Sequence, residues 1–239
     1  MEQLLKELIE RLKSQFGQRL ISVILYGSAA AADDREIEYS DLNILCVLDA
    51  VDSHMLAQSE PVFRWWREQR QPAPLLMSEE EVRTSTDCFP IEFQDMKDRR
   101  RILHGRDVVA DLEIDFKFHR AQVEYQLRTK KLRLRQQATA LLVKNDDSLV
   151  KLCAESLSTF CVLGRHALLL SGVQVHPKKR DVIAQLAKSV GGGFDAFSVL
   201  LDVREGKPYR GSVAESRSLF DNYLMQIQAV IGYVDRLER

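Results

Sequence analysis

The sequence predicts an α+β protein, in which a small mixed β-sheet with helices is followed by an all-α helical bundle. Short apolar runs of strand length, rich in β-branched residues and bounded by turn residues, occur in the first half. The second half instead shows four or five segments with apolar residues at helical spacing and no convincing strand. We place the boundary near residue 112, which predicts two domains, 1–112 and 113–239.

The first half begins with an amphipathic helix and two strands. Residues 1–16 carry leucine and isoleucine at helical spacing, and Gly17 follows as a stop signal. The run LISVILYG (20–27) is an apolar strand that ends on glycine, and DLNILCVL (41–48) is a second strand. The polar segment 33–40 between them is expected to be a loop.

The rest of the first half is predicted to contain two more strands. Residues 53–70 are expected to form a helix in which Trp65 and Trp66 provide core and rim packing. Residues 74–77 are expected to form a short strand. A Ser-x-x-Glu capping box at 78–81 predicts the start of another helix. The run FPIEF (89–93) predicts a strand with Glu92 on the face opposite its apolar neighbours. A short helix through Ile102 and Leu103 is expected to end at Gly105.

The helical bundle of the second half follows from periodicity and from loop residues between the segments. A long helix opens it, and glycines or polar turns separate the helices that follow. The expected helices cover residues 113–143, 148–170, 178–190, 194–203 and 212–238.

Composition excludes several classes of protein. The chain is 45% hydrophobic and 29% charged, which is typical of globular proteins. No apolar run approaches the ~20 residues that cross a bilayer, and the N-terminus has no signal-peptide pattern, so we expect a cytoplasmic protein without a membrane partner. The four cysteines form no C-x-x-C pair and the five histidines show no metal spacing, which predicts reduced thiols and no zinc site.

The net charge of −1 conceals a difference between the halves. Residues 1–112 hold 14 Lys and Arg against 21 Asp and Glu, a balance of −7, and residues 113–239 hold 20 against 14, a balance of +6. Two halves of opposite charge could face each other or hold a metal-bound polyphosphate together. Ordinary surface variation is the alternative.

The segment that carries chemistry joins the first two strands. Gly27-Ser28 follows the first strand, and Asp41-x-Asn43 opens the second after twelve intervening residues. A glycine lets the backbone approach a phosphate, and Ser28 can donate its amide and its hydroxyl. Residues at i and i+2 of a strand share a face, so Asp41 and Asn43 can hold Mg²⁺ against a triphosphate.

This pattern resembles the signature of the DNA polymerase β-like nucleotidyltransferases, in which a Gly-Ser or Gly-Gly turn precedes Asp-x-Asp on the next strand. The resemblance is closest to the bacterial branch of aminoglycoside adenylyltransferases and minimal nucleotidyltransferases, and it covers about residues 20–105. It implies a nucleotidyltransferase domain over 1–112, with Mg²⁺ as cofactor and ATP or another nucleoside triphosphate as substrate. The acceptor would be a hydroxyl on a small molecule or a protein, and the sequence names neither.

A third carboxylate normally completes the metal site of this family. Glu92 is the first candidate and Asp95 the second, so the expected catalytic and metal-binding set is Asp41, Asn43 and Glu92. Asn43 departs from the family pattern because asparagine offers a carbonyl oxygen but no charge. Two nearby metal ions need several carboxylates to offset their repulsion, so the site could bind one metal, bind weakly, or be inactive.

Seven cations lie within residues 117–135, opposed by Glu124 alone. Arg128 and Lys131 share a helix face and could bind the triphosphate, together with Gly27 and Ser28. A solvated face of a bundle helix is the alternative. Glu124 could act as general base, but an i,i+4 ion pair with Arg120 or Arg128 is the preferred interpretation. The slightly acidic chain and the lack of aromatic residues among the cations of 128–135 argue against a nucleic-acid partner, and a homodimer stays open.

Three functions therefore compete. The first is an enzyme that transfers a nucleoside monophosphate from a triphosphate to a hydroxyl. The second is a catalytically weakened or inactive protein of the same fold, which binds a nucleotide or a partner. The third, a minimal nucleotidyltransferase paired with a helical nuclease domain, is disfavoured because Arg165 and His166 are adjacent and do not show the expected Arg-x4–6-His spacing.

Overall fold

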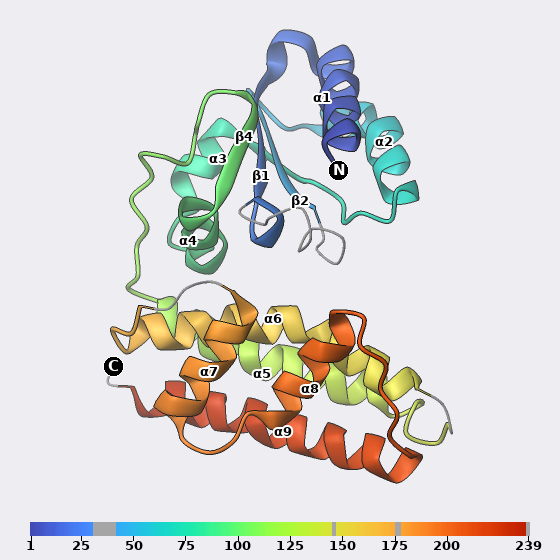
Figure 1. Cartoon of the computed structure of the whole chain (residues 1–239). Coiled ribbons are helices and arrows are strands. Elements are labelled where there is room, and N and C mark those ends of the chain that lie inside the picture. Colours follow the sequence, from blue (N-terminus) through green and yellow to red (C-terminus); the bar gives the residue numbers. More distant parts are fainter. Residues whose placement is uncertain (31–41, 145–146, 175–177, 238–239) are drawn as a thin grey trace. The chain divides into compact units, whose positions relative to one another are not determined.

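The chain divides into two compact units, Met1–Phe116 and Lys117–Arg239. The structure is a computed structural model that describes residues 1–30, 42–144, 147–174 and 178–237. Strands and helices are mixed in the first unit, whereas the described part of the second unit is helical (Figure 1). The predicted α+β class, with a small mixed sheet and a helical bundle, is confirmed.

The sheet of the first unit has four strands in the order β3-β2-β1-β4. Strand β1 is antiparallel to both of its neighbours, and β2 is parallel to β3, so the sheet is mixed. The strands expected at 20–27, 41–48 and 74–77 are confirmed in β1, β2 and β3. The bounds are β1 Leu20–Tyr26, β2 Asn43–Leu48, β3 Leu75–Ser78 and β4 Arg100–Gly105.

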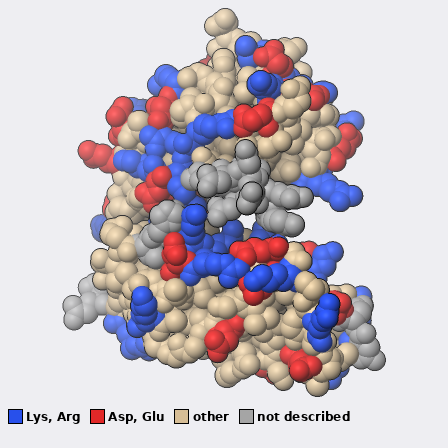
Figure 2. All heavy atoms as spheres, viewed as in Figure 1, with Lys and Arg blue, Asp and Glu red and all other residues tan. Residues whose placement is uncertain are grey.

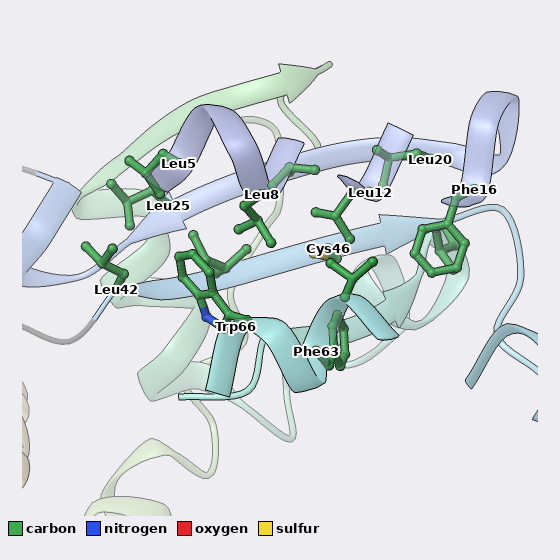
Figure 3. Packing of buried hydrophobic residues seen from close by; sticks show 14 of the residues in the cluster. Leu5, Leu8, Leu12, Phe16, Leu20, Leu25, Leu42, Cys46, Phe63 and Trp66 are labelled. Atoms are coloured by element: carbon green, nitrogen blue, oxygen red, sulfur yellow. The ribbon is translucent and has the colours of Figure 1, made fainter. Parts of the chain in front are cut away.

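Two helices, α1 (Glu2–Phe16) and α2 (Ser53–Glu68), cover one face of the sheet. Their apolar sides meet the inward side chains of β1 and β2, as Figure 3 shows for α1 leucines and α2 aromatic residues around Cys46. The alternation of side chains along a strand sends the other set of apolar residues to the opposite face. There they pack against α3 (Glu79–Thr84) and α4 (Pro90–Asp98) through Val82, Phe93 and Met96.

Both tryptophans of the chain lie side by side on α2. The Trp66 ring is fully buried in the core and its Nε1–H donates to the Pro72 carbonyl at 2.9 Å. The Trp65 ring lies at the rim, with the Arg11 guanidinium 4.3 Å from the ring centroid. The expectation that one packs in the core and the other at the rim is confirmed.

Two predicted elements of the first unit are wrong. Residues 89–93 are not a strand: Pro90 occupies the first turn of α4, where a missing N–H costs nothing, and Glu92 therefore lies on a helix. Residues 102–103 are not helical but belong to β4, an edge strand that begins with Arg100 and Arg101. Charged residues are common on edge strands. Here they left only a short apolar stretch, which was interpreted as part of a helix.

In its described residues, the second unit is a bundle built around α6, which packs against α5, α7, α8 and α9. Its first helix begins later than expected, because Leu112 and Ile114 pack onto the core of the first unit. Among the described residues no helix is long and apolar enough to span a membrane. The bounds are α5 His119–Ala138, α6 Ser148–Leu170, α7 Lys179–Val190, α8 Asp195–Arg204 and α9 Val213–Arg236.

Candidate active site

The turn after β1 is built on Gly27. Its φ of 78° lies in the left-handed region that favours glycine. The Gly27 N–H donates to the Arg99 carbonyl at 3.1 Å, and its carbonyl accepts from the Ala30 N–H at 3.2 Å. Ala29 is buried in the core below and anchors the short 3₁₀ turn Ser28–Ala30. These two backbone hydrogen bonds close the turn at the end of the strand.

Asn43 lies beside this turn, at the start of β2. It is the register partner of Tyr26, the last residue of β1. Its Nδ2 atom would lie 3.4 Å from a Cβ atom on Gly27, so the absence of a side chain at Gly27 leaves the Asn43 amide uncovered on that side. Directly opposed residues of two strands share a face of the sheet, so Tyr26 and Asn43 point to the same side.

Glu92 and Asp95 belong to α4, which covers this same face. Burial, together with the negative charges of Glu92 and then Asp95, raises the pKa of Tyr26 to about 12. That electrostatic influence places both carboxylates near the end of β1, although the element that carries them is a helix and not the expected strand. Asp95 is almost fully buried, whereas Glu92 is half-buried and more open to a ligand.

Part of the expected site lies outside the described residues. Asp41 is one of these, as are Asp33, Asp34 and Glu38, which could add charge to the site. Within the described ranges no three His, Cys, Asp or Glu side chains gather in a metal-binding group. Asn43 and Glu92 do offer oxygen ligands of the kind that Mg²⁺ accepts. The assignment of Asp41, Asn43 and Glu92 as a metal site stays a prediction.

The basic residues expected to bind the nucleotide are engaged within the helical bundle. Arg128 pairs with Glu124 at 2.8 Å and approaches Asp235 of α9 at 3.9 Å. Lys131 donates to the Gln228 side chain at 2.7 Å, and its pKa is lowered by burial and by neighbouring arginines. Glu124 also pairs with Arg120, which confirms the expected i,i+4 ion pairs. Binding of a nucleotide by Arg128 and Lys131 stays a prediction.

Tyr26 is a residue that sequence reasoning missed. It directly precedes the Gly-Ser turn, and this position next to the motif is the signal that could have indicated it. A second unforeseen feature is a buried histidine pair in the second unit, in which His119 Nε2 and His166 Nδ1 lie 2.9 Å apart. His119 is the first residue of α5, and His166 lies in the second half of α6. The two residues are far apart in the sequence, so only the folded bundle brings them together.

The charge difference between the halves does not produce a surface of one sign on the face shown in Figure 2. There, Lys and Arg side chains lie beside Asp and Glu side chains over both units. Most of the ion pairs of the described residues are exposed, and such pairs contribute little to stability. Charge alone therefore does not locate a ligand on this face.

Comparison with known proteins supports the fold. A spectinomycin adenyltransferase, AAD(9) from Enterococcus faecialis, solved with ATP and spectinomycin, matches 97% of this chain and 99% of its own, with a TM-score of 0.60 and 13% identity. The toxin–antitoxin assembly MntA-HpeT, in a mutant form, matches 43% of this chain and 74% of its own, with a TM-score of 0.30 and 16% identity. No protein-family model and no curated protein gives a significant match.

The fold of the chain is thus that of a nucleotidyltransferase. The match to the adenyltransferase extends over both units, the sheet domain and the helical bundle. The predicted resemblance to the adenylyltransferase-like branch is confirmed at the level of fold. At 13% identity the match shows the fold and does not transfer an activity.

The conformation of Gly27 leads to a first prediction. Gly27→Ala should destabilise the protein by about 1–2 kcal/mol, because an L-residue at this φ is strained. Its methyl group would also touch the Asn43 amide and should weaken ATP binding. Chemical denaturation and calorimetry measure the two effects.

Gly172→Ala is a matched control. Gly172 has the same φ of 78°, but no atom lies within 4 Å of the Cβ it would acquire. This variant should lose similar stability and keep its affinity for ATP. If both variants bind ATP equally well, the turn at Gly27 does not form part of a nucleotide site.

Proposed function

We propose that the protein is a Mg²⁺-dependent nucleotidyltransferase that moves a nucleoside monophosphate from a triphosphate to a hydroxyl of a small molecule. The observation that carries the proposal is the position of Asn43, beside the glycine turn of β1 and on the face covered by the α4 carboxylates. A nucleotidyltransferase fold over the whole chain supports it. ATP is the first triphosphate to test, because the AAD(9) structure contains ATP together with a small-molecule acceptor.

Each residue has a distinct task in this proposal. The turn at Gly27 lets the backbone and Ser28 approach the phosphates without a side chain in the way. Asp41, Asn43 and Glu92 would hold Mg²⁺, which neutralises phosphate charge and aligns the attacking hydroxyl. Glu92 is the candidate to accept the proton of that hydroxyl, whereas Glu124 is paired with Arg120 and Arg128. A protein in place of the small molecule is the second class of acceptor.

A binding protein that does not turn over is the alternative function, and Asn43 is the observation that favours it. An amide at this position leaves the site one negative charge short of the usual family pattern. Such a site can still hold one metal ion and a nucleotide. Binding of ATP is therefore common to both functions, and release of pyrophosphate distinguishes them.

The experiment is a pyrophosphate-release assay with each nucleoside triphosphate, run with and without Mg²⁺ against panels of small alcohols and proteins. The proposal expects acceptor-dependent release that requires Mg²⁺, with ATP preferred. Calorimetry in parallel should show ATP binding that depends on Mg²⁺. Equal ATP binding with and without Mg²⁺, or binding without release for any acceptor, would contradict the proposal. The second of these results would favour the binding protein.

A further inference from the structure

A pocket of about 190 Å³ lies between α5 and α6, wholly within the second unit. Its α5 side presents two cations and an amide, and its α6 side presents two hydroxyls. Its volume is below the ~300 Å³ at which typical pockets for drug-sized ligands begin, so a smaller group fits it. The lining residues are Lys130, Arg133, Leu134, Gln137, Ser156, Thr159 and Phe160.

The two cations of this pocket differ from their neighbours on α5. Arg120 and Arg128 form ion pairs with Glu124, and Lys131 donates to Gln228. Lys130 and Arg133, in contrast, form no ion pair within the described part of the chain, and the residues that line the pocket include no carboxylate. Two positive charges that share a hollow without a protein counter-charge favour an anion.

The hydroxyl groups of the pocket have separate tasks. The Ser156 hydroxyl donates to the Cys153 carbonyl at 2.8 Å and lies 3.1 Å from the Tyr223 hydroxyl. Because the Ser156 proton goes to that carbonyl, the Tyr223 hydroxyl donates to Ser156, and burial raises the pKa of this phenol well above its usual value. The Ser156 proton is therefore used within the protein and is not available to a ligand. Thr159 and Gln137 are exposed and can donate to a ligand beside the two cations.

The floor of the pocket is apolar and well packed. Leu134 and Phe160 are each 2% exposed, and the Phe160 ring meets the Tyr223 ring edge-on at 5.8 Å between centroids. Both therefore have little freedom to move, since a buried side chain in a packed core stays near one rotamer. A packed floor keeps the backbones of α5 and α6 at a constant separation, so the exposed side chains above it can close around a compact ligand.

From this arrangement we propose that the pocket binds a phosphate group, as inorganic phosphate or as the phosphomonoester of a small molecule. The dianion of a phosphate balances the charges of Lys130 and Arg133. Its oxygens accept two N–H bonds from one planar guanidinium, and further bonds from ammonium, amide and hydroxyl donors. The proposal concerns binding within the helical unit and does not depend on the transfer activity proposed above.

The test is a calorimetric titration of the full chain with inorganic phosphate at constant ionic strength, with chloride as the reference anion. Wild-type protein should show saturable binding of phosphate. Arg133→Gln, and separately Lys130→Gln, should weaken it about tenfold, as expected for a lost charged hydrogen bond of ~1.4 kcal/mol. Arg135→Gln is the matched control, because it removes the same charge from the same helix outside the pocket lining.

Ribose 5-phosphate, compared with ribose, separates the two sources of the phosphate. Tighter binding of the sugar phosphate than of inorganic phosphate would assign a phosphomonoester, and the reverse order would assign the free ion. If neither inorganic phosphate nor ribose 5-phosphate binds saturably, the proposal is overturned. If Arg133→Gln and Arg135→Gln lose the same amount of phosphate affinity, the proposal is also overturned. That result would show a general attraction of phosphate to the basic helix and not a specific site. Circular dichroism of each variant verifies that the bundle is folded.

Discussion

Asp41→Asn is expected to lower nucleotidyl transfer by roughly 1,000-fold, an effect of about 4 kcal/mol on the transition state. The substitution keeps the size of the side chain and removes its charge. With Asn43 already neutral, it would leave the Asp-x-Asn segment without any carboxylate. Phosphoryl-type transfer depends on charge neutralisation by the metal, so loss of the metal ligand should remove most of the rate. Initial rates of pyrophosphate release over a range of Mg²⁺ concentrations measure it.

Asp49→Asn is the control for this experiment. Asp49 follows the other end of β2 and forms an exposed ion pair with Arg19 at 3.1 Å. Removal of its charge changes the net charge of the domain equally, and it should leave the rate within about twofold because exposed pairs contribute little. If Asp41→Asn retains full activity with unchanged Mg²⁺ dependence, Asp41 is not a metal ligand and the proposed site is wrong.

Asn43→Asp should raise turnover and lower the Mg²⁺ requirement, each by about tenfold or more. A carboxylate here faces the same side as Tyr26 and the α4 carboxylates. At a few ångströms and an effective dielectric of ~20, a charge–charge attraction is worth several kcal/mol before desolvation offsets it. Each ~1.4 kcal/mol that remains changes metal affinity tenfold. The measurement is the rate of pyrophosphate release as a function of Mg²⁺ concentration.

The same variant separates the enzyme from the binding protein. In a binding protein, Asn43→Asp should tighten Mg²⁺-dependent ATP binding in calorimetry and still release no pyrophosphate. Asn222→Asp, which adds the same charge at an exposed position of α9, should change neither property. The opposite result is that the wild-type protein releases pyrophosphate at a good rate and Asn43→Asp abolishes this release. Asparagine would then be the working metal ligand, and an added charge at this position would not help the reaction.

The sequence predicted the first two strands and the glycine turn directly after the first one for a clear physical reason. All residues of β1 except Ser22 are apolar or aromatic, they lie on both faces, and Gly27 follows the strand; such a run is typical of a buried strand. Glu92 was selected as a candidate from a wrong element. A five-residue apolar run such as FPIEF fits a strand or a buried helix equally well by periodicity, and the proline at position 90 was the stronger signal.

Other parts of the structure could not be predicted from local patterns. Strand β4 contains only two adjacent apolar residues, Ile102 and Leu103, and its pairing with β1 depends on the tertiary fold. The close relation of Tyr26 to the α4 carboxylates also requires the packing of α4 on the sheet. The same holds for the pocket of Lys130 and Arg133, because its second wall comes from a different helix.

The location of the tryptophans has a practical consequence for spectroscopy. Both indoles of the chain belong to α2, and the helical bundle has none. Fluorescence excited selectively in tryptophan therefore reports the sheet-containing unit alone, whereas far-ultraviolet dichroism is dominated by helices of both units. Recording the two signals along one denaturation curve separates the unfolding of the two units without cutting the chain. It also assigns any change in indole emission upon addition of a ligand to the unit that carries the glycine turn.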